Sequence, residues 1–219
     1  MHFFFLLPLL IMLLSSCATT APEPELTTPQ KLQLWQQRQQ QMSSFQTWGI
    51  RGRVALFIDN DVYNLGLNWI IAEDHSTLKL EAALGQGMIQ LQRNAAEVSL
   101  TTSEGDSYYG QNAEQVLQQS TGWSIPVDGL ESWIKGINHA QSSYTQTLDN
   151  TGLASTLTQD RWKINYLDYT RAELEQYNNP LLPHKIYMKR DNIALKIVID
   201  QWQPEQNSSS SDLFPAFPE

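Results

Sequence analysis

The side chains that could bind a metal ion or transfer a proton are scattered through this sequence. No cluster of further ligands at the spacing of a metal site surrounds the four histidines, His2, His75, His139 and His184. The chain contains no Gly-x-Ser-x-Gly elbow, Walker loop or Rossmann glycine pattern, and the glycine pair in Gly85-Gln86-Gly87 is weak evidence for a phosphate site. The sequence therefore predicts a protein that is not an enzyme and that holds no metal ion or cofactor.

The only cysteine, Cys17, has surroundings that point to a specific modification. It follows Leu14-Ser15-Ser16, which resembles the lipobox of bacterial lipoproteins, where the cysteine is acylated and becomes the mature N-terminus. The apolar run before it is too short to cross a hydrocarbon core about 30 Å thick and is typical of a removable signal. We predict a signal peptide over 1–16 and a lipid anchor at Cys17. Ala18 is not an aspartate, which in Gram-negative lipoproteins suggests sorting to the outer membrane.

Composition limits the remaining possibilities. The formal net charge of −9 argues against a nucleic-acid partner and gives no reason to expect attraction to anionic lipid. Residues 17–28 form a linker of Thr, Pro and Glu that is too polar to pack, and the polar, serine-rich residues 203–219 predict a disordered tail. The folded domain is expected over 29–202, which is long enough to bury a substantial core.

A helix is expected near the start of this domain. The segment 31–46 follows Thr28-Pro29, a plausible cap and first-turn pair. Positions three and four apart place Leu32, Trp35, Gln39, Met42 and Phe45 on one mostly apolar face. The favoured interpretation is a helix packed over a sheet. A membrane-surface helix is the alternative, and its polar face would be expected to be basic rather than glutamine-rich.

From Gly49 onward the apolar period changes to two, which is typical of strands. The first two alternating sets are joined by a turn at Asn60-Asp61, and later strand-like runs cover 76–82, 87–93, 95–102, 106–109, 144–148, 155–159, 161–166, 185–189 and 193–202. Two short helical segments, 112–122 and 130–137, interrupt them. Short strands separated by turns predict a mainly β fold with helices (α+β), an antiparallel meander that curls into a barrel or a sandwich.

The aromatic content leaves two functions open for the inner side of that sheet. Seven tryptophans and eight tyrosines are many for a domain of this size. They either fill a core or line the concave face of a site for an apolar ligand, since such sites are mostly apolar with a few polar groups. Composition alone does not separate these alternatives.

Short motifs in a fixed order resemble the LolB family of outer-membrane lipoproteins over about 35–202. The matching residues are Trp48-Gly49-Ile50-Arg51-Gly52-Arg53, Asn68-Trp69, Leu84-Gly85, Gly122, Ile125-Pro126, Leu130, Trp133-Ile134, Gly136, Gln159, Trp162, Ile164, Tyr166, Tyr169, Pro183, Ile199 and Trp202. The resemblance implies an unclosed antiparallel β-barrel covered by short helices. It also implies an outer-membrane protein, facing the periplasm, that accepts acylated lipoprotein cargo from a soluble LolA-like periplasmic carrier and inserts it into that membrane. A monomer is expected.

The resemblance also assigns a site. Its apolar hollow would shield the acyl chains of the cargo. The alternation of the strands then gives the candidate lining residues Trp48, Val54, Leu56, Trp69, Leu80, Leu91, Trp133, Ile164, Tyr166, Leu195 and Ile197. A register error of one residue would move any strand's set to the opposite face.

One residue has a separate role implied by the resemblance. In the family, an exposed leucine on the loop after the third strand is implicated in membrane delivery, and Leu84 occupies that place, without the proline that often precedes it. The alternative is a leucine buried at the end of the strand. If Leu84 is exposed, Leu84→Glu is expected to leave cargo capture intact and to impair delivery.

Two rival functions remain open at this level. One is a periplasm-facing lipoprotein that binds another apolar ligand, such as a free lipid or a glycolipid. The other is an assembly lipoprotein that docks through its tail, residues 213–217. We expect deletion of 203–219 to have little effect, which would argue against the second.

Overall fold

The structure is a computed structural model that describes residues 26–83 and 87–203. The predicted signal peptide, Cys17, Leu84 and residues 204–219 of the predicted tail lie outside the described residues. The predicted boundaries were wrong by one residue at each end of the domain, because Thr28 already belongs to the first helix and Gln203 is still paired and buried in the last strand. The strands are β1 (Trp48–Ile58), β2 (Asp61–Ile71), β3 (His75–Ala82), β4 (Met88–Asn94), β5 (Val98–Thr102), β6 (Ser107–Gly110), β7 (Tyr144–Leu148), β8 (Ala154–Gln159), β9 (Trp162–Arg171), β10 (Leu181–Arg190) and β11 (Ile193–Gln203). The helices are α1 (Thr28–Ser43), α2 (Ala113–Thr121), α3 (Val127–Trp133) and the short 3-10 helix η2 (Glu175–Tyr177).

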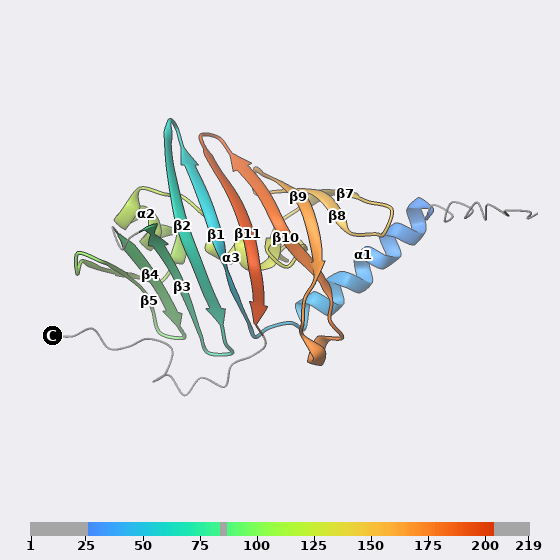
Figure 1. Cartoon of the computed structure of the whole chain (residues 1–219), viewed down its shortest axis with the longest axis horizontal. Coiled ribbons are helices and arrows are strands. Elements are labelled where there is room, and N and C mark those ends of the chain that lie inside the picture. Colours follow the sequence, from blue (N-terminus) through green and yellow to red (C-terminus); the bar gives the residue numbers. More distant parts are fainter. Residues whose placement is uncertain (1–25, 84–86, 204–219) are drawn as a thin grey trace, which may run out of the picture.

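All strands of the described chain belong to one antiparallel sheet (Figure 1). Its order is β6-β5-β4-β3-β2-β1-β11-β10-β9-β8-β7, so two meanders meet where the first strand pairs with the last. β6 and β7 stand at opposite ends of this order and do not pair with each other. The prediction of an unclosed antiparallel barrel with short helices is confirmed.

The seam between β1 and β11 explains one glycine of the Trp48–Arg53 motif. The pairing register shifts between Arg51 and Gly52, and there the carbonyl oxygen of Val198 approaches the glycine. A Cβ added to Gly52 would lie 2.2 Å from that oxygen, so no larger residue fits without moving the backbone.

Hairpin turns fix the register of the neighbouring strands. Ile58 pairs with Asp61, so the first turn consists of Asp59 and Asn60, one residue earlier than predicted. The reason is the backbone conformation of Asp59, which has a φ of 51°, a left-handed value that aspartate tolerates better than most residues.

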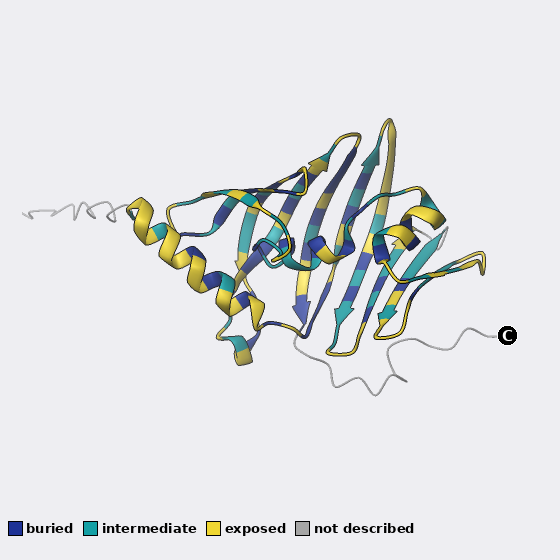
Figure 2. Ribbon diagram, turned by 180° about the vertical axis from the view of Figure 1, so that it is seen from behind, coloured by how far each residue is buried: buried dark blue, intermediate teal, exposed yellow. Residues whose placement is uncertain are grey.

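Helices cover one face of the sheet, which we call the inner face (Figure 2). The chain passes from β6 to β7 through α2 and α3, which lie over this face, and α1 packs against the part of the sheet that contains β7. In α1 the side chains of Trp35 and Met42 are buried, as expected for a helix packed over a sheet, whereas Leu32 is 42% exposed.

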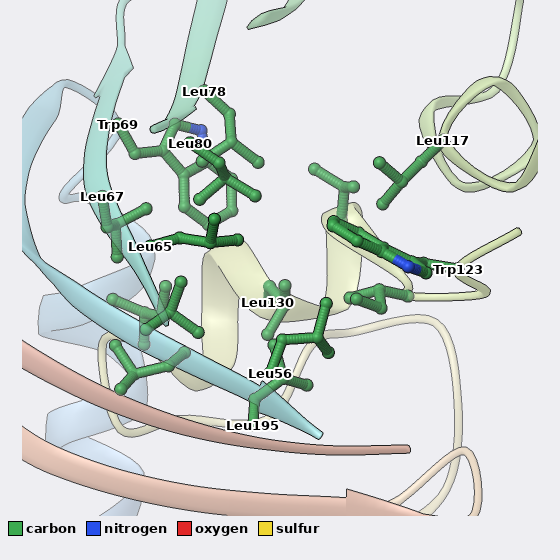
Figure 3. A pocket seen from close by; sticks show the side chains of 15 residues that line it. Leu56, Leu65, Leu67, Trp69, Leu78, Leu80, Leu117, Trp123, Leu130 and Leu195 are labelled. Atoms are coloured by element: carbon green, nitrogen blue, oxygen red, sulfur yellow. The ribbon is translucent and has the colours of Figure 1, made fainter. Parts of the chain in front are cut away.

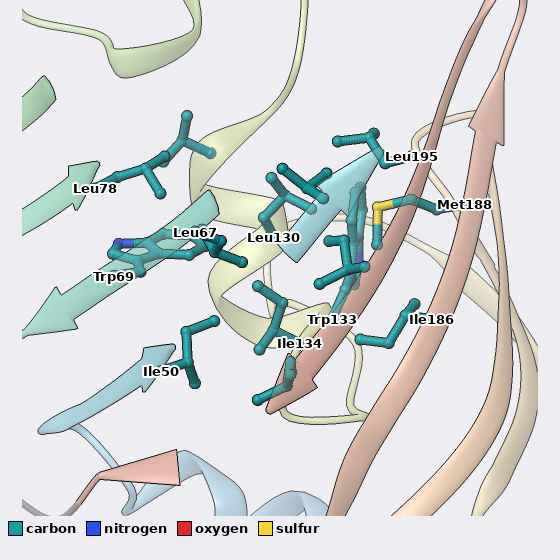
Figure 4. Packing of buried hydrophobic residues seen from close by; sticks show 14 of the residues in the cluster. Ile50, Leu67, Trp69, Leu78, Leu130, Trp133, Ile134, Ile186, Met188 and Leu195 are labelled. Atoms are coloured by element: carbon teal, nitrogen blue, oxygen red, sulfur yellow. The ribbon is translucent and has the colours of Figure 1, made fainter. Parts of the chain in front are cut away.

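The core lies between the inner face and the helices (Figure 4). One group contains Leu67, Trp69 and Leu78 of β2 and β3, which face Leu130 of α3. The other contains Trp133, with Ile186 and Met188 of β10. These two groups occupy the same face of one sheet, but they differ in how they are held.

Candidate functional site

An apolar cavity lies between the inner face and the segment 113–134, which we call the lid (Figure 3). Fifteen residues line it, none of them charged. They come from the sheet, with Val54, Leu56, Leu65, Leu67, Trp69, Leu78, Leu80, Leu195 and Ile197, and from the lid, with Leu117, Trp123, Ile125, Val127, Leu130 and Ile134.

The cavity is almost filled by its own walls. Its volume is about 40 Å³, whereas pockets for small ligands usually hold roughly 300–1,000 Å³. A water molecule needs about 10–15 Å³ in this measure. In this conformation the lid therefore leaves space for a few small molecules and none for an acyl chain.

The structure brings together six of the eleven sequence-predicted lining residues. They are Val54 and Leu56 of β1, Trp69 of β2, Leu80 of β3, and Leu195 and Ile197 of β11. Adjacent strands present them on the same face, because Val54 pairs with Ile197 and Leu56 with Leu195.

The other five predicted residues are buried elsewhere in the core. Trp48 contacts Trp69 and Trp202, with ring centroids 5.5 and 5.6 Å apart. Leu91 lies on β4, and Trp133, Ile164 and Tyr166 lie towards the opposite end of the sheet.

Sequence reasoning omitted nine of the lining residues. Three of them, Leu65, Leu67 and Leu78, lie on strands, where the same alternation could have identified them. The six from the lid carried a weaker signal, since helical spacing showed which positions are apolar but not which strands lie beneath them.

An ion-pair group joins the lid to the sheet on one side. Arg93 of β4 donates a 2.6 Å hydrogen bond to Asp128 and a second hydrogen bond to Glu131, both on α3. Burial raises the pKa of Glu131, and the attraction of Arg93 only partly opposes this. The guanidinium thus bridges two carboxylates at the edge of the cavity.

A second polar group joins the lid to β10. The guanidinium of Arg190 donates to the carbonyl oxygen of Ser124 at 2.6 Å and to its hydroxyl at 3.0 Å. Its Nη2 lies 3.5 Å from Glu114 of α2, and the guanidinium stacks 4.9 Å from the ring centre of Trp162. Neither Arg93 nor Arg190 is among the residues that line the cavity.

Behind the cavity, a buried hydrogen-bond network holds the end of α3. The indole of Trp133 donates to Gln159 Oε1 at 2.9 Å, and Tyr166 donates its hydroxyl to the carbonyl of Trp133 at 2.9 Å. Gln159 Nε2 donates to the carbonyl oxygens of His139 and Ser142, at 2.8 and 3.0 Å. We call these five residues the anchor.

Two cations extend this fixed region to α1. Lys135 Nζ donates to the carbonyl oxygens of Met42 and Phe45, at 3.2 and 3.1 Å, and Arg38 donates to those of Lys135 and Leu181, both at 2.8 Å. Burial lowers the pKa of both Lys135 and Arg38. Because these bonds run to backbone carbonyls, they position the helix without a carboxylate partner.

The polar side chains do not form a familiar catalytic arrangement. Asp160 and Ser142 both approach the same nitrogen of His139, Nε2, at 2.5 and 3.5 Å. A Ser-His-Asp triad requires the hydroxyl and the carboxylate on opposite ring nitrogens. Among residues 26–83 and 87–203, no group of three or more His, Cys, Asp or Glu could hold a metal ion, and no helix is long and apolar enough to cross a membrane.

Comparison with known proteins gives one consistent family. A family model described as "Outer membrane lipoprotein LolB" matches residues 46–202. The "Outer-membrane lipoprotein LolB" of Francisella tularensis subsp. novicida (strain U112) is 33% identical over 194 residues, 89% of this chain and 90% of that protein. The protein of the same name from Pseudomonas putida (strain GB-1) is 29% identical over 197 residues, 90% of this chain and 94% of that protein.

A solved structure supports the architecture alone. A DUF1329 family protein from Desulfovibrio piger superimposes with a TM-score of 0.50 at 8% sequence identity, over 83% of this chain and 94% of that one. At this identity the likeness concerns the fold and carries no functional information.

Proposed function

The chain belongs to the LolB family of outer-membrane lipoproteins, and from this premise we propose that it accepts acylated lipoproteins from a soluble periplasmic carrier and inserts them into the outer membrane. In this proposal the protein is a monomer, held at the membrane by acyl chains on Cys17 and facing the periplasm. The carrier is LolA-like. No covalent bond is made or broken in the transfer, so the protein is a receptor and not an enzyme.

The apolar cavity beneath the lid is the observation that carries this proposal. Its wall offers only apolar surface and indole rings, which suits the acyl chains of a lipoprotein. Each methylene shielded from water contributes about 0.8 kcal/mol, in the carrier as well as here, so the direction of transfer depends on the difference in how many methylenes each site shields. The cargo must also leave for the bilayer, which an apolar site without hydrogen bonds to the chain permits.

Cargo binding requires the lid to separate from the sheet, because about 40 Å³ cannot contain an acyl chain. The lid is held over the cavity by apolar contacts and by the ion pairs of Arg93 and Arg190. The pair of Arg93 with Asp128 is partly exposed, with side-chain exposures of 31% and 66%, and such a pair contributes little stability. Arg190 is only 13% exposed, so opening of the lid requires cargo contacts that compensate mainly for the loss of its bonds to Glu114 and Ser124.

The experiment that tests the proposal is transfer in solution. The chain from residue 17 onward, carrying Cys17→Ala, is mixed with a carrier loaded with radiolabelled lipoprotein, and the label is followed into a complex with this protein. We expect transfer. Leu80→Trp should reduce it by filling the opened cavity, whereas Gln90→Trp, on the opposite face of the neighbouring strand, should not.

Absence of transfer from a carrier that loads a known receptor would contradict the proposal. If the folded protein instead copurified with fatty acid, the alternative of a lipoprotein that binds free lipid or glycolipid would be favoured. Both functions use the same cavity, so dependence on the carrier separates them.

Delivery is a distinct step with its own variant. We propose that Leu84 acts in release to the membrane and not in capture. With Leu84→Glu, the label should reach this protein at the normal rate but pass more slowly into outer-membrane vesicles. Equal slowing of both steps would assign Leu84 to the cavity or to folding instead.

A further inference from the structure

The outer face of the sheet, opposite the helices, carries an unexpected concentration of positive charge. It is turned to the viewer in Figure 1, with α2 and α3 behind. The residues involved, which we call the basic strip, are Arg51 and Arg53 of β1, Lys163 of β9, Lys185 and Lys189 of β10, and Lys196 of β11. These strands are neighbours in the sheet, in the order β1-β11-β10-β9.

Strand alternation places the strip opposite the core. Lys196 stands between Leu195 and Ile197, which line the cavity, so its own side chain projects from the other face. Lys163 stands in the same way between the buried Trp162 and Ile164.

Few carboxylates lie near the basic strip to neutralise its positive charge. Asp168 and Asp200 are the only carboxylates on these four strands, and both are already paired, with Lys185 at 3.7 Å and Arg53 at 2.8 Å. Within the described chain, Arg51, Lys163, Lys189 and Lys196 make no such ion pair. This excess is notable in a protein whose formal net charge is −9.

The arrangement costs stability and does not add to it. Lys163 and Lys189 are directly opposite one another in the antiparallel pairing of β9 and β10. Like charges in directly opposed positions destabilise a sheet, whereas one acidic residue in either place would stabilise it. A role in folding therefore does not explain the strip.

The same face is hollowed beside the strip. Arg53 and Lys196 border a depression of about 480 Å³ that Ala55 and Gly66 also line. Its lining includes one carboxylate, that of Glu81, which is paired with Lys79 at 2.7 Å. The small side chains on β1 and β2 leave this space, and a Cβ on Gly66 would have no neighbour closer than 3.7 Å. Ala83, directly before the loop proposed for delivery, also borders the depression.

We propose that the basic strip is a docking face for the anionic phospholipid headgroups of the outer membrane. Four of these six cations make no ion pair with a described residue, and the set complements a surface of phosphates. A membrane lipoprotein has such a surface beside it. Docking would turn the outer face to the membrane and leave the lid side open to the periplasm. The inference rests on the outer-membrane location in the proposed function, and not on cargo transfer.

The test uses the chain from residue 17 onward with Cys17→Ala, so that no lipid anchor contributes. Binding is measured by cosedimentation with vesicles of phosphatidylethanolamine and phosphatidylglycerol, and with vesicles of phosphatidylcholine alone. We expect binding to the anionic vesicles only. It should weaken as salt rises from about 0.01 M to about 0.15 M, where the screening length falls from about 30 Å to about 8 Å.

Two double variants locate the interaction. Lys163→Gln with Lys189→Gln should weaken binding to anionic vesicles by about tenfold to thirtyfold, since each cation near such a surface contributes about 1 kcal/mol. The control, Lys31→Gln with Arg171→Gln, lowers the net charge equally outside the strip, on α1 and at the end of β9, and should have little effect. The first variant should also be at least as stable as the parent, because it removes a like-charge pair.

The outcomes divide clearly. Equal binding to neutral vesicles, equal loss in both variants, or no binding at low salt would overturn the proposed docking face. None of these results bears on cargo transfer, because capture from the carrier in solution requires no membrane. Failure of transfer with intact vesicle binding would reject the receptor proposal and leave the docking face standing.

Discussion

The lid and the anchor occupy the same inner face of one sheet, and they are held by different forces. The lid contacts the sheet mainly through leucine, isoleucine, valine and tryptophan side chains around a small void, with the polar contacts of Arg93 and Arg190 beside it. The anchor contacts it through buried hydrogen bonds from Trp133 and Tyr166, with Gln159 at the centre. Apolar contact is non-directional and can be exchanged for contact with a lipid, whereas a buried hydrogen bond that breaks leaves an unpaired group.

Helix α3 belongs to both regions. Its side chains Val127 and Leu130 line the void, and Trp133, at its end, is fixed by Gln159. For the opening required by the proposed function, we therefore expect the lid to turn about a fixed point at the end of α3. The experiments below test whether the two regions differ in the way that this view requires.

The largest effect is expected from Gln159→Leu in the anchor. The substitution leaves the indole N–H of Trp133, the N–H and carbonyl of His139 and the carbonyl of Ser142 without this partner. Because each buried unpaired group costs about 1–3 kcal/mol, the free energy of unfolding should fall by roughly 3–6 kcal/mol. Urea denaturation measures this, and Gln92→Leu, at an exposed position of β4, should change it by less than about 0.5 kcal/mol.

The next effect compares one leucine from each region. Leu157→Ala, at a fully buried position of β8 at the anchor end of the sheet, should lower the free energy of unfolding by about 3–5 kcal/mol. Leu130→Ala should cost about 2–3 kcal/mol, because the lid can move towards the space that is left. Equal losses measured by denaturation would mean that the lid is as rigidly packed as the anchor.

The sequence predicted the strands of the sheet more completely than the residues that line the cavity. Alternation with a period of two depends only on strand geometry, so positions such as Val54, Leu56 and Leu195 could be assigned to the inner face directly. It did not reveal the ends of β9 and β10, because the register shifts near Pro183 and Lys185 interrupt the alternation there.

The boundary between cavity and core could not be predicted for a different reason. Trp133 and Leu130 share one helix, but only the second lines the void, and the difference depends on a hydrogen bond to Gln159, 26 residues away in sequence. Long-range polar pairing leaves no periodic signal in the chain. The basic strip was hidden in the same way, because net charge averages over surfaces that only the strand pairing separates.

A smaller effect on stability, with a larger effect on binding, is expected from Arg93→Met. Loss of the ion pairs to Asp128 and Glu131 should lower the free energy of unfolding by about 1–2 kcal/mol, because Asp128 is exposed but Glu131 is largely buried and loses its cation. The lid should nevertheless open more often, so binding of an apolar fluorescent dye should rise several-fold. Arg53→Met is the matched control, since it removes an ion pair with Asp200 on the outer face and should leave dye binding unchanged.

The smallest expected effect is on the pH dependence of stability, which should have opposite signs for Glu131 at the lid and Asp160 near the anchor. Burial raises the pKa of Glu131 at the lid above its ordinary value of 4.5, despite Arg93. Its contribution to stability is therefore complete below that value and is lost as pH rises through the higher folded-state pKa. For Asp160, burial also raises the pKa, but hydrogen bonds from His139 and Ser142 outweigh it, so the pKa lies below the ordinary 3.8. This contribution is present above 3.8 and is lost as pH falls through the folded-state pKa.

Amide hydrogen exchange, measured for each residue, tests these two opposite pH dependences. Amides of α3 should become less protected as pH rises from about 4.5, after correction for the intrinsic exchange rate, whereas amides near Asp160 should lose protection only in more acid solution. Glu131→Gln should abolish the first trend and preserve the second. If the amides of both regions lost protection in the same direction of pH change, the lid and the anchor would open together. The proposed fixed point at Trp133 would then be wrong.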